Sequence, residues 1–292
     1  MKTFRVMIKA DNLTFHYPGS HSPAAKNLTF DICQGEIFGF LGPSGAGKST
    51  TQKILIGLLK GYTGTVIIRD TDLSRWGAEL YNHIGIGFEL PNHYLKLTAL
   101  ENLQFFGSFY RKSLAIENLL EQVGLLEDAG KKVEDYSKGM KVRLNFVRSL
   151  LHDPEILFLD EPTSGLDPVN ARKIKDIILA RRASGKTIFI TTHNMHDADE
   201  LCDRISFIVD GEIMETDSPK NLKLEYGKSR VRVEYANGEN PSRLNHQEFP
   251  LKELGKDQAF REILSSREII SIHSQEASLD EVFIKVTGRQ LI

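Results

Sequence analysis

A glycine-rich segment near residue 45 contains the residue types that can surround a phosphate group. The run Gly42-Pro43-Ser44-Gly45-Ala46-Gly47-Lys48-Ser49 fits the pattern GxxxxGK[ST]. Glycines let backbone N–H groups turn toward an anion, and the N-terminus of a following helix adds partial positive charge. The alternative is a glycine-rich turn that only caps a helix. Because a strand is predicted before the run and a helix after it, the pattern favours a site for nucleotide phosphates.

Four polar side chains in or beyond this run could act on a bound nucleotide. Lys48 would reach the β- and γ-phosphates of ATP, and Ser49 would offer its hydroxyl to Mg²⁺. Asp160 and Glu161 end the apolar run Ile156–Leu159, which is typical of a central parallel strand. Asp160 would hold Mg²⁺ through water, and Glu161 would polarise the water that attacks the γ-phosphate. The alternative for either acid is a solvated strand end or a helix cap.

A histidine occupies a comparable place after another predicted strand. His193 follows Thr187–Thr191, in the sequence Thr191-Thr192-His193. A single histidine is more often a packed or surface residue than a catalytic one. Doubly wound sheets, however, bind ligands at the rim where parallel strands end. An imidazole at this rim can donate to the γ-phosphate and register whether it is present, so we assign His193 a catalytic role.

Apolar periodicity and turn residues predict the elements that position these groups. Predicted strands cover Thr3–Lys9, Ala25–Ile32, Glu36–Leu41, Thr65–Arg69, Ile84–Phe88, Ile156–Leu159 and Thr187–Thr191. A hairpin with the two-residue turn Asp210-Gly211 follows, between Ile205–Val209 and Glu212–Glu215. Predicted helices cover Lys48–Leu59, a capping box at Thr98–Glu101 continuing to about Tyr110, Leu114–Val123, Met140–Leu151, Pro168–Ala183 and Asn194–Cys202.

The pattern changes after about Tyr226. A short strand is predicted around Val231, Val233 and Tyr235, then a polar loop at Asn237–Asn245. A further strand around Ile269–Ile272 and a last helix capped at Ser278–Glu281 follow. We therefore predict a main domain at 1–226, with a helical subdomain at about 90–152, and a small α/β extension at 227–292.

Composition excludes several classes of protein. The net charge of the 292 residues is 37 − 39 = −2, so no global basic field attracts nucleic acid, and no nucleic-acid partner is expected. Two cysteines cannot form a disulfide framework, and the first ten residues do not resemble a signal peptide. No apolar run is long enough to span a bilayer. These features predict an intracellular globular chain.

The motifs, taken in order, resemble those of the ATP-binding cassette (ABC) ATPases over about residues 5–225. Tyr17 matches the aromatic residue that stacks on adenine, Gly42–Thr50 the Walker A loop, and Ile156–Glu161 the Walker B strand. Ser164–Asp167 matches the D-loop, and His193 matches the switch histidine. Each motif except Walker A is weak alone, but their shared order is specific.

Two motifs depart from the family pattern. Tyr136-Ser137-Lys138-Gly139-Met140 occupies the place of the LSGGQ signature, with Lys138 for its first glycine and Met140 for its glutamine. Lys138 is either a tolerated surface substitution or an extra cation near the phosphates. Glu89 occupies the place of the glutamine in the Gln-loop. It is either a metal ligand, which we favour because hard cations prefer carboxylate oxygen, or a solvated group that only relays to a partner.

The resemblance implies an α/β fold: a P-loop NTPase of ABC type with a mixed core sheet, an antiparallel β subdomain and a helical subdomain. It also implies ATP and Mg²⁺ as ligands and a head-to-tail homo- or heterodimer of cassettes, in which Ser137 and Gly139 face the Walker A loop of the other cassette. The residues then expected to bind ATP are Tyr17, Gly42, Pro43, Ser44, Gly45, Ala46, Gly47, Lys48, Ser49, Thr50, Ser137 and Gly139. Glu161, His193 and Lys48 are the expected catalytic residues, and Ser49, Asp160 and Glu89 the expected metal ligands.

Within the family, the sequence looks most like ATP-binding subunits of bacterial drug-export systems. Such subunits often share the Tyr-Ser-Lys-Gly-Met signature, a glutamate in the Gln-loop and a tail like Ser278–Phe283. This likeness implies an ATPase peripheral on the inner face of the cell membrane that drives a separate transmembrane permease, exporting a small hydrophobic molecule, lipid or glycoconjugate. The alternatives are a non-transport ATPase of the translation or DNA-repair type and a P-loop kinase, which would leave the signature, D-loop and His193 unexplained.

Overall fold

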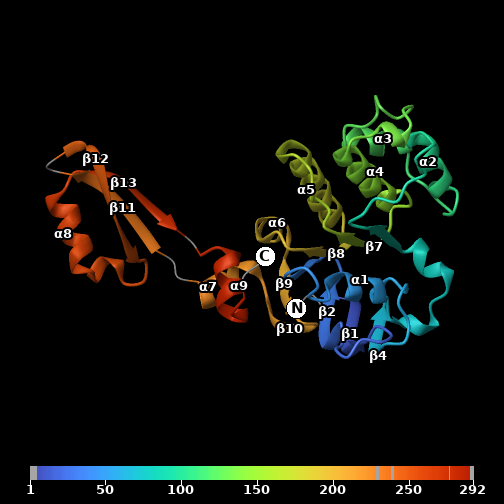
Figure 1. Ribbon diagram of the computed structural model, residues 1–292, viewed down its shortest axis with the longest axis horizontal. Coiled ribbons are helices and arrows are strands. Elements are labelled where there is room, and N and C mark those ends of the chain that lie inside the picture. Colours follow the sequence, from blue (N-terminus) through green and yellow to red (C-terminus); the bar gives the residue numbers. More distant parts are fainter. Residues whose placement is uncertain (1–4, 228–229, 238–239, 276, 290–292) are drawn as a thin grey trace. The chain divides into compact units, whose positions relative to one another are not determined.

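The computed structural model describes residues 5–227, 230–237, 240–275 and 277–289 (Figure 1). They form two compact units, which meet in the sequence between Thr216 and Asp217. The predicted domain limits, including the helical subdomain at about 90–152, stay predictions. Within the described ranges, no helix is both long and apolar enough to cross a membrane.

A six-stranded sheet forms the centre of the first unit, with strand order β10-β9-β3-β8-β7-β6. The strands are β3 (Ile37–Leu41), β6 (Ile84–Gly87), β7 (Ile156–Asp160), β8 (Thr187–Thr192), β9 (Arg204–Val209) and β10 (Glu212–Asp217). The five strands β9, β3, β8, β7 and β6 are parallel to one another. Every residue of β3, β7 and β8 is buried, which explains the uninterrupted apolar runs in the sequence.

The predicted hairpin joins β9 to β10 and is confirmed. Asp210 and Gly211 have φ angles of 51° and 79°. Positive φ at both central residues is what a two-residue type I′ turn requires, and its twist matches that of the flanking strands.

A second, antiparallel sheet has the order β2-β1-β4-β5. Its strands are β1 (Val6–Phe15), β2 (Ala25–Cys33), β4 (Thr63–Ile68) and β5 (Thr71–Asp72). Phe30 of β2 packs on Phe38 and Phe40 of β3, with ring centroids 5.8 and 5.0 Å apart. The two sheets therefore share one aromatic core, and the predicted combination of a mixed core sheet with an antiparallel β subdomain is confirmed.

Helices cover the sheets and supply the segment between β6 and β7. They are α1 (Lys48–Leu55), α2 (Ala99–Gly107), α3 (Ile116–Gln122), α4 (Lys138–Leu150), α5 (Pro168–Ala183) and α6 (Met195–Leu201), with short 3₁₀ turns at Leu73–Arg75, Ala78–Asn82 and Val133–Asp135. Figure 1 shows α2, α3 and α4 as one group. The capping box predicted at Thr98 and Glu101 is present at the start of α2, and the predicted limits of α5 are confirmed.

The second unit contains a three-stranded antiparallel sheet with order β12-β11-β13. Its strands are β11 (Arg230–Asn237), β12 (Asn240–Pro250) and β13 (Ile269–Gln275), and its helices are α7 (Pro219–Tyr226), α8 (Gln258–Ser266) and α9 (Leu279–Thr287), with a 3₁₀ turn at Leu254–Lys256. Val231, Val233, Phe249 and Ile263 form a small core between this sheet and α8.

Four elements of the structure differ from what the sequence predicted. The loop predicted at Asn237–Asn245 is wrong, because β12 begins at Asn240 and pairs with β11; its polar residues gave no apolar alternation. Helix α8 was not predicted. The helix predicted over Lys48–Leu59 ends at Leu55, since Gly57 has a φ of 76°. Strand β1 continues to Phe15 through an irregular register near Asn12, while residues 3 and 4 of its predicted start lie outside the described residues.

Gly85 in β6 lets α4 lie directly on the sheet. A Cβ on Gly85 would stand 2.1 Å from the backbone oxygen of Ser149 in α4 and 2.7 Å from Cγ of Pro154. We expect Gly85→Ala to lower the free energy of unfolding by about 1–3 kcal/mol, as overpacking does, measured by chemical denaturation. Gly77→Ala is the matched control, since a Cβ there meets no atom within 4 Å. Equal stabilities for the two variants would contradict this account.

Candidate nucleotide site

The parallel strands bring the predicted site residues to one edge of the sheet. Leu41 of β3 pairs with Thr192 of β8, Thr191 pairs with Asp160 of β7, and Leu159 pairs with Gly87 of β6. Parallel strands in register end at the same edge. The glycine-rich loop, His193, the two acids and Glu89 therefore follow one another along this edge, each after a different strand.

The loop after β3 has the backbone conformation that the glycine pattern predicts. Gly45 and Gly47 have φ angles of 79° and 104°, and a Cβ on Gly47 would stand 2.3 Å from the backbone oxygen of Ala24. The ammonium of Lys48 donates to the carbonyl oxygens of Gly42 and Pro43 at 2.6 and 2.9 Å. The loop thus curls around the start of α1, where backbone N–H groups are available to an anion.

The charge of Lys48 lies in a buried position. Burial lowers the pKa of Lys48, and the nearby carboxylates of Glu161, Asp160 and Glu89 act in the opposite direction. Lys48, at the start of α1, therefore interacts electrostatically with carboxylates from two other segments: the end of β7 and the loop that carries Glu89.

Oxygen donors converge beside the loop. Ser49 Oγ lies 3.3 Å from Oδ1 of the buried Asp160, and the hydroxyl of Thr191 donates to the same oxygen. A hydroxyl and a carboxylate oxygen from two different elements are ligands of the hard kind that Mg²⁺ prefers. The residues present therefore fit a magnesium ion held between Ser49 and Asp160.

A buried glutamine extends this group of hydrogen bonds. The Gln52 side chain is 1% exposed, its Oε1 lies 3.4 Å from Oγ1 of Thr191, and its Nε2 has no partner among the described residues. Thr191 has one hydroxyl proton, which goes to Asp160. With the amide turned so that Nε2 faces Thr191, Gln52 donates to Thr191 and Thr191 donates to Asp160. The amide then supports the carboxylate orientation that the metal requires.

Three donors hold the carboxylate of Glu161. Thr192 Oγ1 donates to one oxygen at 2.9 Å, while the backbone N–H and Nδ1 of His193 donate to the other at 2.9 and 2.7 Å. Glu161 is buried and has a φ of 49°, a conformation that costs a residue with a Cβ about 1–2 kcal/mol. The three hydrogen bonds and the backbone conformation together fix the orientation of the Glu161 carboxylate, as a general base requires.

His193 remains accessible on its other side, because its side chain is 63% exposed. Nδ1 is engaged with Glu161, and within the described residues no hydrogen bond involves Nε2. The structure thus links Glu161 and His193 by hydrogen bonds, whereas the sequence predicted a role for each of them separately.

Tyr17 stands beside the phosphate loop. Its hydroxyl is 3.2 Å from Oγ1 of Thr50, and its ring contacts Phe15 edge to face with centroids 5.0 Å apart. The ring is 39% exposed, so one face is available for stacking on a base.

Ser137 and Gly139 lie at the N-terminus of α4. Ser137 Oγ accepts from the N–H of Met140 at 3.2 Å and caps the helix. No hydrogen bond within the described chain joins Ser137 to the phosphate loop. The Lys138 side chain lies beside Gly165, with Cε and Nζ 3.2 and 3.4 Å from where a Cβ of Gly165 would be. Lys138 therefore packs on the D-loop of its own chain.

Glu89 is exposed and borders a small cavity together with Asp160 and Glu161. Its loop is anchored from α4: Asn145 Nδ2 donates to the backbone oxygen of Phe88 at 2.7 Å, and Arg148 donates to that of Asn92 at 2.6 Å. Neither anchor was predicted. Asn145 is a buried polar residue on a largely apolar helix face, which it shares with Ser149 one turn later, and that polar residue was the signal for it. Thr192 and Gln52 gave no comparable signal in the sequence.

Comparisons with known proteins agree with this geometry. A family model described as ABC transporter matches residues 25–164, and one described as the C-terminal domain of a fluoroquinolone efflux ABC transporter matches 229–276. The chain is 55% identical over 286 residues to a fluoroquinolones export ATP-binding protein of Mycobacterium tuberculosis strain H37Rv, covering 98% of this chain and 94% of that protein. It is 32% identical to the bacitracin transport ATP-binding protein BcrA of Bacillus licheniformis, covering 97% of each.

A solved structure is similar as well. The ATP-binding cassette MJ0796, in a dimeric post-hydrolysis state bound to ADP and Pi, is 30% identical with a TM-score of 0.67. The match covers 73% of this chain and 98% of that one.

Glu161 should be the base for hydrolysis of ATP. We expect Glu161→Gln to keep its affinity for Mg-ATP while kcat falls by roughly 10²–10⁴-fold, because the proton acceptor is lost and the phosphate contacts remain. Phosphate release and equilibrium nucleotide binding measure the two effects. Glu155→Gln is the control, since Glu155 directly precedes the same strand but pairs with Arg69 at 3.0 Å. Equal turnover in both variants would assign the base elsewhere.

Proposed function

This chain belongs to the ATP-binding, ATP-hydrolysing subunits of ABC export systems, and we propose that the system it drives exports planar aromatic antibiotics of the fluoroquinolone class. The relatives that carry this specificity are 55% identical over nearly the whole chain, against 32% for the bacitracin relative. The second unit also matches a domain described from fluoroquinolone efflux transporters. The non-transport ATPase and the kinase are set aside, because the relatives at 55% identity are export ATP-binding proteins.

The proposed reaction assigns one task to each residue at the edge of the sheet. Lys48 and the loop N–H groups bind the β- and γ-phosphates. Ser49 and Asp160 would hold Mg²⁺, which would neutralise phosphate charge. Glu161 takes a proton from water, whose oxygen bonds to the γ-phosphorus as the bond to the bridging oxygen breaks, which gives ADP and phosphate. His193 orients Glu161 through Nδ1 and meets the γ-phosphate through Nε2. Tyr17 stacks on adenine.

Glu89 is proposed as a further magnesium ligand. It shares a cavity border with Asp160 and Glu161, and its carboxylate acts on the charge of Lys48.

A second cassette completes the site in this proposal. Ser137 is exposed and, within the described chain, makes no hydrogen bond to the phosphate loop, so the N–H groups at the start of α4 could instead bind a phosphate held by a partner's loop. The solved relative MJ0796 is dimeric with ADP and Pi. The second cassette is another copy of this chain or a related one.

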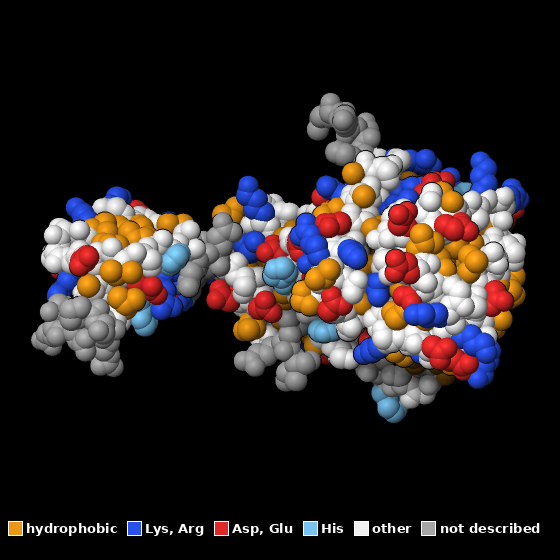
Figure 2. Space-filling model, turned by 90° about the horizontal axis from the view of Figure 1, so that it is seen from above, with side chains coloured by type: hydrophobic (Ala, Val, Ile, Leu, Met, Phe, Trp, Pro, Cys, Tyr) orange, Lys and Arg blue, Asp and Glu red, His pale blue; other side chains and the backbone are white. Residues whose placement is uncertain are grey.

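A separate permease supplies the path through the membrane, with this chain peripheral on the inner face. The proposed contact surface runs from Glu89 to Tyr110. Leu90, Tyr94 and Leu95 are 78%, 51% and 50% exposed there, and Phe109 of α2's trailing turn is 66% exposed. In the view from above, apolar side chains interrupt the charged surface of the first unit (Figure 2). Exposed apolar groups that gather in one segment mark a partner site.

Mixing two inactive variants tests the composite site. Lys48→Ala should lose most ATP affinity, because a charge-assisted phosphate contact is lost. Ser137→Arg should bind ATP as a monomer but hydrolyse it poorly. Mixed in equal amounts, they should recover part of the wild-type phosphate release, since one of two sites is intact in the mixed dimer. Ser184→Arg, at an exposed serine after α5, is the control and should stay active. Mixed dimers without activity would contradict the arrangement in trans.

Drug susceptibility tests the cargo. A sensitive bacterial host that expresses this chain with the permease that co-purifies with it should tolerate several-fold more fluoroquinolone, and Lys48→Ala should abolish the gain. Tolerance to bacitracin should not change. Increased tolerance to bacitracin but not to fluoroquinolone would refute the proposed cargo while leaving the export function intact.

A further inference from the structure

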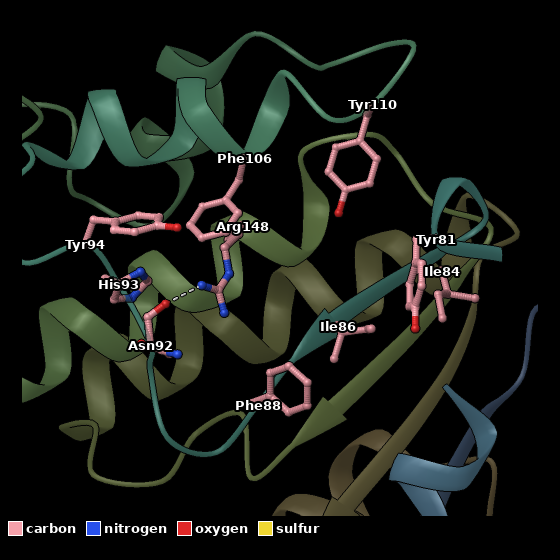
Figure 3. Close-up of a pocket in the computed structure, with 10 residues that line it drawn as sticks. All are labelled: Tyr81, Ile84, Ile86, Phe88, Asn92, His93, Tyr94, Phe106, Tyr110 and Arg148. Atoms are coloured by element: carbon pink, nitrogen blue, oxygen red, sulfur yellow. Dashed lines mark hydrogen bonds between the residues drawn. The ribbon is translucent and has the colours of Figure 1, made fainter. Parts of the chain in front are cut away.

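A cavity of about 430 Å³ opens between the end of β6, the loop that follows it, α2 and α4 (Figure 3). We call it the aromatic pocket, because Tyr81, Phe88, Tyr94, Phe106 and Tyr110 line it. Figure 3 shows the Arg148 side chain projecting among these rings. The pocket is large enough to take several side chains of another protein.

Arg148 is the one residue with a formal charge at neutral pH in the described lining. His93, the other titratable nitrogen base, is buried, and burial lowers its pKa to about 4, so it is neutral at pH 7. No Asp or Glu belongs to the described lining. The aromatic pocket is therefore an apolar chamber with a single positive charge.

The partners of Arg148 are all neutral. Its guanidinium donates to the backbone oxygen of Asn92 at 2.6 Å (dashed in Figure 3) and to Oδ1 of Asn145 at 2.7 Å. Its Cζ lies 4.7 Å from the ring centroid of Phe106. Burial lowers the pKa of Arg148, and no carboxylate of the described residues pairs with it. A half-buried cation without a counter-ion is energetically costly. A carboxylate that reached the Arg148 guanidinium would form a bidentate pair of hydrogen bonds with it.

Arg148 also connects the pocket to the nucleotide site. Asn145, which accepts from Arg148, donates to the backbone oxygen of Phe88. Arg148 itself holds Asn92 at the other end of the same loop. The two residues of α4 thus clamp both ends of the loop that carries Glu89, so a group bound to Arg148 acts directly on that loop.

The rim of the pocket fits an apolar chain segment. Phe105 contacts both Tyr94 and Phe109, each pair with centroids 5.1 Å apart. These three rings are at least 40% exposed, so the apolar surface continues beyond the cavity, farther than a small ligand would need. A second cassette is expected at the other end of α4, near Ser137.

We propose that the aromatic pocket receives a segment of the permease that carries one aspartate or glutamate among apolar side chains, and that this carboxylate pairs with Arg148. The inference rests on the proposed function, since it takes the partner to be a permease. It adds to the proposed function the kind of permease segment that binds and the residue of this chain that pairs with it, Arg148. Charge complementarity selects an acidic residue, and the apolar rim selects its neighbours.

Charge reversal tests the pair. The chain and its permease are co-expressed and isolated from membranes, with a photo-crosslinking phenylalanine analogue at Phe109 to identify the permease segment by mass spectrometry. Arg148→Glu should reduce the permease that co-purifies at least tenfold, and changing the acidic residue of the crosslinked segment to Arg should restore it. Arg143→Glu is the matched control: Arg143 also lies on α4 and donates to backbone oxygens, those of Val123 and Gly124, outside the pocket.

The possible outcomes separate the inference from its premise. A crosslinked segment without Asp or Glu, or wild-type recovery of permease with Arg148→Glu, overturns the pair while the proposed function stands. If the wild-type chain brings down no permease, the proposed function fails, and the inference fails with it. Should Arg148→Glu lower the thermal midpoint, Arg148→Met takes its place, and a loss of permease without a shift in that midpoint supports the pair.

Discussion

The parallel register of β3, β8, β7 and β6 is the constraint on which the nucleotide site depends. These strands come from distant parts of the sequence, and each is followed by one group of site residues. A shift of one residue would turn alternate side chains to the opposite face, and Asp160 would lose its contacts with Thr191 and Ser49. Because both faces are buried, apolar alternation cannot specify this register. The packing against the sheet is close: at Gly39, a Cβ would stand 2.7 Å from Sγ of Cys202, which follows α6.

Charged groups at this edge are tolerated because each is held by donors or by an opposite charge. Asp160 receives hydroxyl protons from Ser49 and Thr191, and Glu161 receives three hydrogen bonds, two of them from His193. Burying a carboxylate without such partners would cost several kcal/mol. The same contacts that make burial possible also orient the two carboxylates, so stability and catalytic geometry have a common origin here.

Helix α4 links three parts of the first unit. Its N-terminus carries Ser137, its middle holds the Glu89 loop through Asn145, and Arg148 faces the aromatic pocket. Gly85 allows the helix to lie against β6 without an intervening side chain. A rigid helix of 13 residues transmits displacement along its length better than a loop would. This arrangement gives a physical route between a partner at the pocket, the Glu89 loop and the signature end of the helix.

The sequence by itself determined the local chemistry. The glycine spacing predicts the loop around Lys48, the apolar run predicts a buried strand before Asp160, and Asp210-Gly211 predicts its hairpin, because each depends on residues that are neighbours in the chain. The order of the motifs, which is that of the ABC ATPases, predicted a mixed core sheet with an antiparallel β subdomain. The tertiary structure alone decided that His193 and Thr192 hold Glu161, that Thr191 contacts both Gln52 and Asp160, and that Arg148 has no acidic partner in the described chain. It also turned the polar segment after Asn240 into a strand. The side-chain contacts join residues far apart in sequence, so no local spacing could predict them. The strand formed because hydrogen bonding to a partner strand can outweigh a weak local pattern.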